Sequence, residues 1–245
     1  MYNGIFTINS PFEVEVRIIL VQQYTLSPNT PYSTLYYMAR SARPGPAVMI
    51  VAGIHGNETA SIQAANKLVR MIGKDQLLIH KGSLMIVPIV NKKAYRQRIR
   101  GVPDLNRTFP RKAGQAAKHP LSAALFEAAK RYRPSWYLDL HEANGLSQRN
   151  AKVLGQTLIT NPGSPAVPAA RKVIKTINRS IANHSHYFNL RLHELPGSSR
   201  TAAARILGAR AVTIETGWSL PFSTRVQYQI DIVRRFLSEA ELMKG

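Results

Sequence analysis

The segment Ala47-Val-Met-Ile-Val-Ala-Gly-Ile-His-Gly-Asn-Glu58 joins an apolar run to a turn with two glycines and then to a candidate helix. Its apolar part, Ala47–Ile54, is nearly continuous, which is typical of a strand that helices bury on both faces. Gly53 and Gly56 let the backbone turn sharply after this strand. The following residues, Glu58–Ile72, repeat apolar side chains at helical spacing. The segment therefore predicts a strand–turn–helix unit of a layered α/β sheet.

The rest of the chain continues this alternation of strands and helices. Strands are expected at Val14–Leu26, Thr34–Arg40, Ala47–Ile54, Leu84–Asn91, Trp136–Leu140, Gln156–Thr160, Leu190–Leu195 and Ala209–Thr216. Helices are expected at Glu58–Ile72, Leu121–Tyr132, Val167–Ala182, Thr201–Leu207 and Ser223–Leu242. The pattern predicts a single α/β domain over residues 1–245, with a mixed, mostly parallel central sheet, helices on both faces and an antiparallel edge formed by the first two strands. The segment Lys92–His119 has no clear period, and such a segment in a compact domain is usually functional or mobile.

Composition and charge exclude several classes of protein. The chain has 245 residues, of which 44% are hydrophobic, so wholesale disorder is excluded. The absence of cysteine excludes a disulfide scaffold, thiol catalysis and cysteine-ligated zinc. No apolar stretch reaches the roughly 20 residues of a membrane span, and Met1–Pro11 lacks the pattern of a signal peptide. The net charge of +20 indicates an anionic partner, but phosphate-cradling glycine loops and RNA-binding aromatic signatures are absent, so nucleic acid is not expected.

Two histidines and a glutamate form the first candidate site. His55 and Glu58 stand at the strand-to-helix turn, and His141 ends a second apolar strand. Open α/β sheets bind ligands where the carboxyl ends of neighbouring strands meet, so we expect these side chains to lie together. Two histidines and one carboxylate are the ligands of a catalytic zinc that keeps its fourth position for water. Asp139 and Glu142 are the candidates to accept the second ring N–H of the histidines.

Two further motifs add to this site. The stretch GVPDLNRTFP, residues 101–110, lies in the segment without a period, and VTIETG, residues 212–217, places Glu215 at the end of an apolar strand. A carboxylate buried at a strand end beside a metal suits a general base. An HExxH zinc site is excluded, because Gly145 and Gly197 stand where the second histidine would be.

The four motifs GIHGNE, DLNRTFP, DLH and TIET, in this order, resemble those of the zinc carboxypeptidases and their relatives, the aspartoacylases and succinylglutamate desuccinylases. Together they run from residue 53 to 217. The resemblance implies a zinc carboxypeptidase-like fold with one zinc ion held by His55, Glu58 and His141. It also implies that Glu215 acts as the general base and acid of an amide hydrolase.

The resemblance also implies how substrate is held. Asn106 and Arg107 would bind a carboxylate of the substrate, the arginine through the bidentate geometry that suits its guanidinium. The family has a further arginine, upstream of this pair, that polarises the scissile carbonyl. Arg100 is the best candidate for that role here, while Arg96 and Arg98 remain alternatives.

Two positions differ from the carboxypeptidase pattern. His193 stands where carboxypeptidases carry a tyrosine, next to a stretch, Glu194–Ser198, that is similar to one in murein peptide amidases. Either His193 replaces the phenol as a donor to substrate, or this loop differs. Arg200 stands where carboxypeptidases line the pocket for the terminal side chain, and arginine there would favour an acidic side chain. The alternative is a surface arginine at the start of a helix.

We expect a zinc-dependent amide hydrolase. Two hypotheses differ in its substrate, and a third assigns the fold no catalytic activity. Residues 218–245 resemble one closing helix rather than the C-terminal β domain of aspartoacylases, so we expect a metallocarboxypeptidase that acts on a carboxylate-bearing, acidic peptide or cell-wall peptide. The alternative is a deacylase of N-acyl amino acids, which the DLHEANG and DLNRTFP stretches fit at least as well. The third is a non-catalytic basic module that binds an anionic polymer, against which the intact ligand set argues.

The positive charge fits a carboxylate-bearing substrate. Six of the 13 acidic residues lie in or beside the expected site: Glu58, Asp104, Asp139, Glu142, Glu194 and Glu215. The remaining surface is therefore more strongly positive than the total charge suggests. Many of the basic residues lie in the segment Lys92–His119, which also carries the expected carboxylate-binding pair. We interpret the charge as a field that steers an anionic substrate, small or polymeric, to the site.

Overall fold

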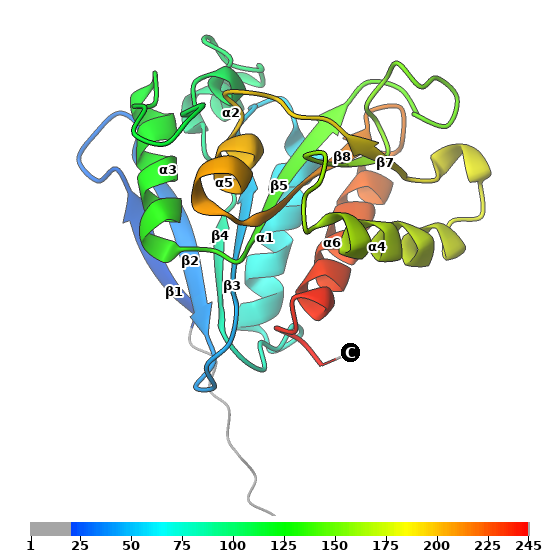
Figure 1. The fold of residues 1–245 in the computed structure, drawn as a ribbon, viewed down its shortest axis with the longest axis horizontal. Helices are drawn as coiled ribbons and strands as arrows, with labels where there is room; N and C mark the ends of the chain where they lie inside the picture. The colour runs from blue at the N-terminus through cyan, green and yellow to red at the C-terminus, as the bar shows by residue number, and fades with distance from the viewer. Residues whose placement is uncertain (1–20, 245) are drawn as a thin grey trace, which may run out of the picture.

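Residues 21–244, which the computed structural model of the protein describes, form an eight-stranded sheet with helices on both faces (Figure 1). The strands are β1 (Val21–Leu26), β2 (Thr34–Arg40), β3 (Ala47–Ala52), β4 (Ser83–Val87), β5 (Trp136–Ala143), β6 (Thr157–Thr160), β7 (Asn189–Leu192) and β8 (Arg210–Gly217). The helices are α1 (Thr59–Gly73), α2 (Lys92–Gln97), α3 (Pro120–Tyr132), α4 (Val167–Arg179), α5 (Ser199–Leu207) and α6 (Phe222–Glu239), with short 3-10 turns η1 (Leu105–Arg107) and η2 (His184–His186). The fold class predicted from the sequence is confirmed.

The strand order is β1-β2-β4-β3-β5-β8-β6-β7. The four central strands, β4, β3, β5 and β8, are parallel to one another. β1 pairs antiparallel with β2 at one edge, as predicted, and β6 pairs antiparallel with β8 near the other edge. The central strands β3, β5 and β8 are buried over almost their whole length, which explains why their sequences are apolar runs and not alternating patterns.

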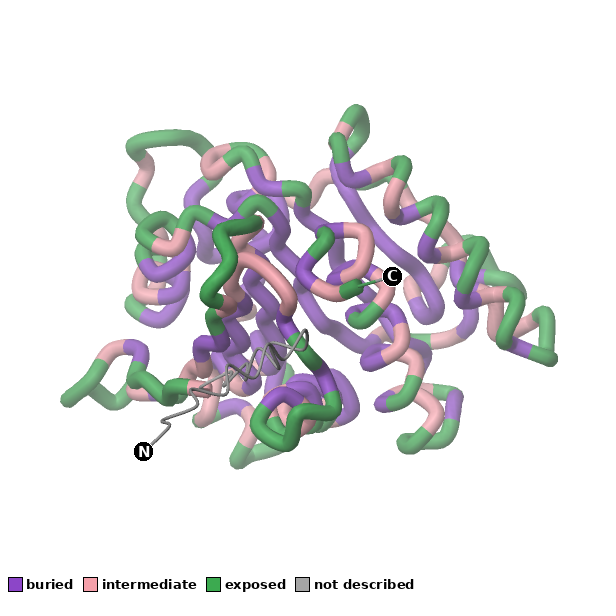
Figure 2. The backbone as a smooth tube through the Cα atoms, turned by 90° about the horizontal axis from the view of Figure 1, so that it is seen from below, coloured by how far each residue is buried: buried purple, intermediate pink, exposed green. Residues whose placement is uncertain are grey.

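Two layers of apolar side chains, one on each face of the sheet, hold the helices in place. Successive residues of a strand point to opposite faces, so Ile50 of β3 belongs to the apolar cluster that includes residues of α1, α4 and α6, whereas Met49 belongs to the cluster that includes residues of α3 and α5. Figure 2 shows that the buried residues follow the strands and the inner sides of the helices, while the exposed residues lie in the loops and outer turns. Among residues 21–244, none of the helices combines the length and the hydropathy that a membrane span needs.

The main difference from the sequence prediction lies in the segment without a period. Helix α2 forms there, with the Asn91 side chain accepting a hydrogen bond from the Ala94 N–H at its start. Ala94 is its only buried residue, so it has no amphipathic pattern to reveal it. β4 ends at Val87 and not at the predicted Asn91, since Pro88 has no N–H to continue the ladder. The first predicted strand, Val14–Leu26, is present from residue 21, and its residues 14–20 lie outside the described part.

Packing of the central strand predicts a large effect of one core substitution. Leu138 lies in the middle of β5 and is fully buried. We expect Leu138→Ala to lower the free energy of unfolding by about 2–5 kcal/mol, because it removes buried methyl groups and leaves a cavity. Leu78 is 42% exposed, so the matched control Leu78→Ala should change that free energy by about 0.5 kcal/mol or less. Denaturant unfolding followed by circular dichroism measures both, and equal losses would contradict this packing.

Candidate metal centre and active site

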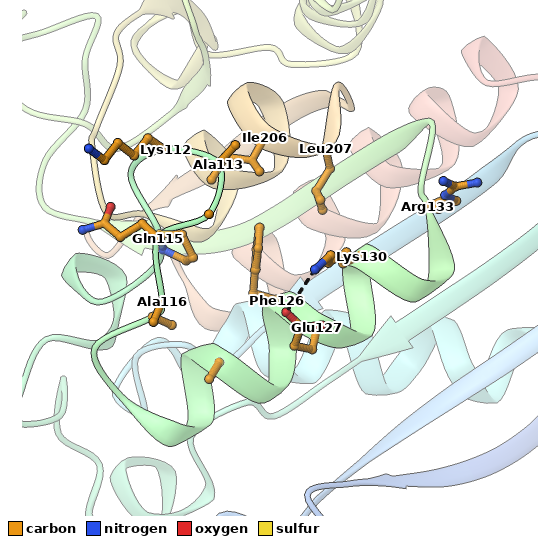
Figure 3. Close-up of a pocket in the computed structure, with 14 residues that line it drawn as sticks. Lys112, Ala113, Gln115, Ala116, Phe126, Glu127, Lys130, Arg133, Ile206 and Leu207 are labelled. Carbon is orange, nitrogen blue, oxygen red and sulfur yellow. Dashed lines mark ion pairs between the residues drawn. The ribbon is translucent and has the colours of Figure 1, made fainter.

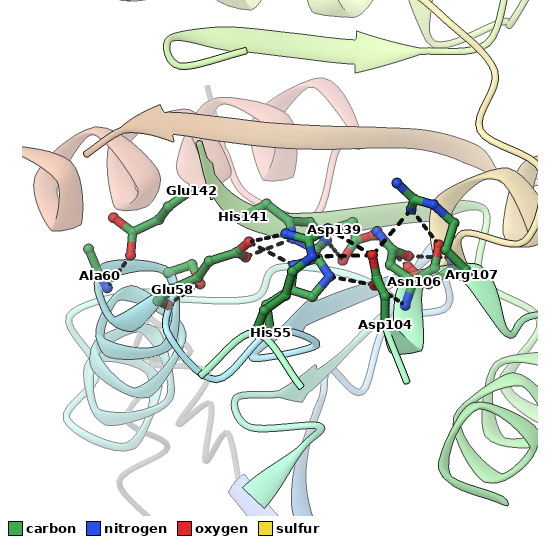
Figure 4. A network of polar contacts seen from close by, with 12 residues as sticks. His55, Glu58, Ala60, Asp104, Asn106, Arg107, Asp139, His141 and Glu142 are labelled. Carbon is green, nitrogen blue, oxygen red and sulfur yellow. Dashed lines mark hydrogen bonds and ion pairs between the residues drawn. The ribbon is translucent and has the colours of Figure 1, made fainter. Parts of the chain in front are cut away.

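The three predicted zinc ligands meet at the carboxyl ends of β3 and β5 (Figure 4). The Nδ1 atom of His55 lies 2.7 Å from one carboxylate oxygen of Glu58, and the Nδ1 atom of His141 lies 2.8 Å from the other. One potential ligand atom from each residue lies within 4.8 Å of the other two. All three side chains are buried. The structure therefore brings together the cluster that the sequence predicts.

The local backbone explains how the cluster forms. At the turn that follows β3, Gly53 has a positive φ of 67°, a backbone conformation that residues other than glycine rarely adopt. Gly56 lies against α2 so closely that a Cβ atom there would be 2.0 Å from the carbonyl carbon of Ala94. Glu58 occupies the N-cap position of α1 but makes no side-chain cap bond within the described chain. Its carboxylate instead faces the two histidines.

Each histidine also faces a second carboxylate. The Nε2 atom of His55 lies 3.0 Å from Asp104 Oδ1, and the Nε2 atom of His141 lies 3.1 Å from Asp139 Oδ1. At His55, the hydrogen bond to Asp104 holds the proton on Nε2 and leaves the Nδ1 lone pair free for a metal. At His141, the contact with Asp139 is an ion-pair distance without a hydrogen bond within residues 21–244. Two imidazole nitrogens and a carboxylate oxygen suit zinc, so the residues present fit one zinc ion. The prediction for Asp139 fits this geometry, while Asp104 was identified only as part of a motif.

Electrostatics around the cluster favour a bound cation. Burial opposes ionisation of Glu58, but His141 and His55 outweigh it and lower the pKa of Glu58 to about 2. Burial also opposes protonation of His141, yet the negative charges of Asp139 and Glu58 raise its pKa well above the ordinary value. This concentration of negative charge around two imidazoles is the environment that a divalent cation stabilises.

Glu215 lies beside the cluster, as predicted. It sits on β8 directly opposite His141 of β5 in the strand register. Its side chain is buried, and its Oε2 atom has no hydrogen-bond partner among residues 21–244. Burial raises the pKa of Glu215 to about 7, with His141 opposing that rise and the charge of Glu58 adding to it. An unpartnered carboxylate oxygen beside a metal centre is free to take a proton from a water molecule.

Of the three arginines considered for the carbonyl, Arg100 lies nearest to the metal ligands. Its guanidinium donates to Asp104 Oδ2 at 3.0 and 3.2 Å and lies 3.8 Å from Glu58 Oε1. Arg96 instead lines a separate cavity with two lysines of α2, and Arg98 stacks over a tyrosine ring. The structure thus places only Arg100 of these three at the cluster, and its catalytic role stays a prediction.

The expected carboxylate-binding pair lies on η1. Asp104 starts this turn by accepting a hydrogen bond from the Asn106 N–H at 2.9 Å. Asn106 is buried, and its Oδ1 atom accepts from the Ser199 N–H of α5 at 3.0 Å. The Arg107 side chain is 46% exposed and donates to the Asn106 carbonyl. Arg107 is therefore accessible to a substrate, whereas Asn106 ties the turn to α5.

Arg200 is not a surface residue, so the alternative interpretation of it is wrong. It is 2% exposed, and its guanidinium donates to Asn161 and, at 2.8 Å, to the His193 carbonyl. Burial lowers the pKa of Arg200 to about 10, against the opposing effect of Asp139, Glu194 and Glu215. The charge of Arg200 therefore acts on the carboxylates of the site from within the core. The His193 side chain is exposed, and its predicted contact with substrate stays a prediction.

Glu142 does not have the position that the sequence analysis assigned to it. Its Oε2 atom accepts from the Ala60 N–H at the start of α1, at 2.7 Å, and its Oε1 atom accepts from Arg225 of α6. No contact with a histidine ring is among its hydrogen bonds in the described chain. The side chains of successive strand residues point to opposite faces, so Glu142 points away from the ring of His141 and toward the face of the sheet that α1 and α6 cover.

A cavity of about 670 Å³ lies elsewhere, between the loop after Pro110, α3 and the end of α5 (Figure 3). Phe126 and Leu207 supply apolar walls, and Lys112 and Lys130 are among its charged residues. None of its lining residues belongs to the metal cluster or to the predicted site. The cavity is therefore not the metal centre.

Comparison with known proteins agrees with this geometry. The model of the succinylglutamate desuccinylase/aspartoacylase catalytic domain matches residues 44–240. A succinylglutamate desuccinylase of Burkholderia pseudomallei is 31% identical over 198 residues, covering 75% of this chain and 52% of the relative. One of Chromobacterium violaceum is 35% identical over 115 residues, covering 42% of this chain and 33% of the relative. The chain spans about half the length of the first of these curated relatives.

Solved structures share the fold at low sequence identity. The apo cell shape determinant protein Csd4 from Helicobacter pylori has a TM-score of 0.70 at 21% identity, over 91% of this chain and 55% of that one. Carboxypeptidase A from Helicoverpa armigera has a TM-score of 0.69 at 16% identity, over 92% and 69%. An aspartoacylase family protein from Mesorhizobium loti has a TM-score of 0.64 at 21% identity, over 96% and 71%. The fold is thus shared with carboxypeptidase A. Because the family model spans all four motifs of the site, the chain belongs to the succinylglutamate desuccinylase/aspartoacylase family of catalytic domains.

Proposed function

We propose that the protein is a zinc-dependent amide hydrolase that removes the acyl group from an N-acyl amino acid. The observation that carries this proposal is the buried cluster of His55, Glu58 and His141 with the unpartnered carboxylate of Glu215 beside it. The family match and the names of the relatives support an acyl-amino-acid substrate over the peptide that we expected from the sequence.

His55, Glu58 and His141 would hold the zinc ion. When bound, zinc polarises a carbonyl and lowers the pKa of a water ligand to about 7. Asp104 orients the His55 imidazole through its Nε2 atom, Asp139 lies 3.1 Å from the Nε2 atom of His141, and both Nδ1 atoms face the Glu58 carboxylate. This arrangement fixes the ligands before substrate arrives, which limits reorganisation during the reaction.

Glu215 is positioned to move the proton. Its free oxygen accepts a proton from the attacking water and later returns it to the amine nitrogen that leaves. The strand register places Glu215 directly opposite His141, so β5–β8 pairing fixes the backbone position from which this carboxylate reaches the cluster. Burial keeps bulk water from competing for that proton.

Two exposed arginines provide the contacts to substrate. Arg100 lies close enough to Glu58 to stabilise the negative charge that develops on the carbonyl oxygen. Arg107 is half-exposed on η1 and can bind the free carboxylate of the amino acid through two parallel hydrogen bonds. Anchoring that carboxylate presents the amide bond to the metal centre.

Replacing the proposed base gives the first test of this mechanism. We expect Glu215→Gln to lower kcat by about 10²- to 10⁴-fold, because the amide cannot take the proton. Zinc content should stay at about one ion per chain in both proteins, since Glu215 is not a ligand. Glu127→Gln on the exposed side of α3 is the matched control. Turnover by Glu215→Gln at the wild-type rate would exclude the role, and a wild type that binds no zinc would favour the non-catalytic module.

A substrate panel tests the acyl-amino-acid assignment. We expect N-succinyl and N-acetyl amino acids to be hydrolysed with a higher kcat/KM than tripeptides of the same terminal residue. Arg107→Met should raise KM for the acyl amino acids by about 10- to 100-fold, the loss expected for a charge-assisted hydrogen bond. Arg111→Met, in the exposed loop that follows, should leave KM unchanged. Faster cleavage of the tripeptides would favour the carboxypeptidase hypothesis.

Ionic strength tests whether the positive charge steers substrate. The chain carries a net charge of +20, so kcat/KM for an acidic N-acyl amino acid should fall steeply as salt screens the field. A substrate whose side-chain carboxylate is replaced by an amide should respond less. Equal salt dependence for both substrates would show that association is not steered by charge.

A further inference from the structure

The N-terminus of α1 is capped in an unusual way. The N–H groups of a helix's first turn need acceptors, and the N-cap side chain usually supplies one. Glu58 holds the N-cap position, but its carboxylate faces His55 and His141 instead. The Ala60 N–H donates to Glu142, the residue that directly follows His141 (Figure 4). One carboxylate of β5 thus joins the two segments that carry Glu58 and His141.

This buried carboxylate depends on an arginine of α6. The Glu142 side chain is fully buried, and the charge of Glu58 lies near it. A buried carboxylate without a counter-charge is strongly destabilising. Arg225 supplies that charge by donating to Glu142 Oε1, and its Nε atom also donates to the Leu220 carbonyl at 3.0 Å. The arginine therefore ties α6 and the loop before it to the metal-binding segments.

A second residue of α6 reaches the backbone of a metal ligand. Gln229 lies one turn after Arg225 on the same side of the helix, and it is fully buried. Its Nε2 atom donates to the His141 carbonyl at 2.7 Å and to Thr216 Oγ1 at 3.2 Å. A buried amide that binds β5 and β8 at once fixes the position of both strand ends.

We propose that Glu142, Arg225 and Gln229 form a brace of positioning residues that sets the separation between the α1 and β5 segments and so the geometry of the zinc ligands. This inference rests on the proposed function, because it assumes that the cluster binds zinc. None of the three touches the reacting atoms. Without the brace, the segments bearing Glu58 and His141 lose their shared anchor, so zinc is held less tightly and in altered geometry.

The apolar side of α6 packs independently of the brace. Val226, Ile230 and Val233 lie in the cluster on the α1 face of the sheet and contribute to docking of the helix. Substitution of a brace residue is therefore expected to leave α6 in place and to change the metal site. This separation makes the brace testable in the whole folded chain.

The test measures binding of Zn²⁺ and Co²⁺ to the full chain. Zinc affinity is measured by competition with a chromophoric chelator, and the visible absorption of the Co²⁺-substituted protein reports coordination geometry. We expect Arg225→Met to weaken zinc binding by about 10- to 100-fold, the range for groups that orient metal ligands, and to change the Co²⁺ spectrum. Arg234→Met, an exposed arginine of the same helix, is the matched control and should stay within about twofold of the wild type.

A double substitution separates positioning from general damage. In Arg225→Met/Glu142→Gln, the amide still accepts the Ala60 N–H but carries no uncompensated charge, so most of the zinc affinity and the Co²⁺ spectrum should return. If the double variant recovers neither the zinc affinity nor the Co²⁺ spectrum, the proposed role of the charge pair between Glu142 and Arg225 is overturned.

A neutral variant keeps the proposal testable if Arg225→Met does not fold. Gln229→Met retains the length of the side chain without its donor, and we expect about tenfold weaker zinc binding with a changed Co²⁺ spectrum. Wild-type affinity and spectrum in the brace variants would overturn the brace and leave the proposed function intact. A wild-type chain that binds neither ion would overturn both.

Discussion

The carboxylate of Glu58 is the interaction on which the architecture of the site depends. Its two oxygens lie 2.7 Å from His55 Nδ1 and 2.8 Å from His141 Nδ1, almost without exposure to solvent. An isolated carboxylate buried to this degree would be strongly destabilising, so its position requires both histidines, or a cation, within contact distance. That requirement fixes β3 and β5 as neighbours and the start of α1 at the carboxyl end of β3.

The use of Glu58 at the metal cluster has consequences beyond it. Since its side chain does not cap α1, a second buried carboxylate, Glu142, takes that place and in turn needs Arg225. The Nε2 atoms of the two histidines likewise face further carboxylates, those of Asp104 and Asp139. Many of the 13 acidic residues of the chain therefore lie in or beside this one site. The outer surface therefore carries a larger excess of positive charge than the net charge of +20 alone indicates.

The sequence predicts the parts of the fold that rest on local patterns. The apolar runs of β3 and β5 identify buried parallel strands, and the residues that follow each run identify the cluster, because strand ends meet at one edge of the sheet. Helix α2 buries a single alanine and leaves no such pattern. The contact between Glu142 and Arg225 joins residues 83 positions apart, and nothing in the spacing of either one indicates it. Arg200 could be placed only by the tertiary structure, since a buried and a surface arginine look alike in sequence.

Burial divides the site into a rigid part and an adaptable part. The cluster of His55, Glu58 and His141 is buried at the strand ends, and both histidines lie within hydrogen-bond distance of the Glu58 carboxylate. Arg100 and Arg107 are each 46% exposed and lie outside the regular sheet, where sequence changes are tolerated more easily. The same core is found in carboxypeptidase A and in an aspartoacylase family protein, at TM-scores of 0.69 and 0.64. If substrate binds as proposed, it meets these exposed arginines and not the buried cluster, so a change of substrate class within this fold is expected to arise in the segment that carries them.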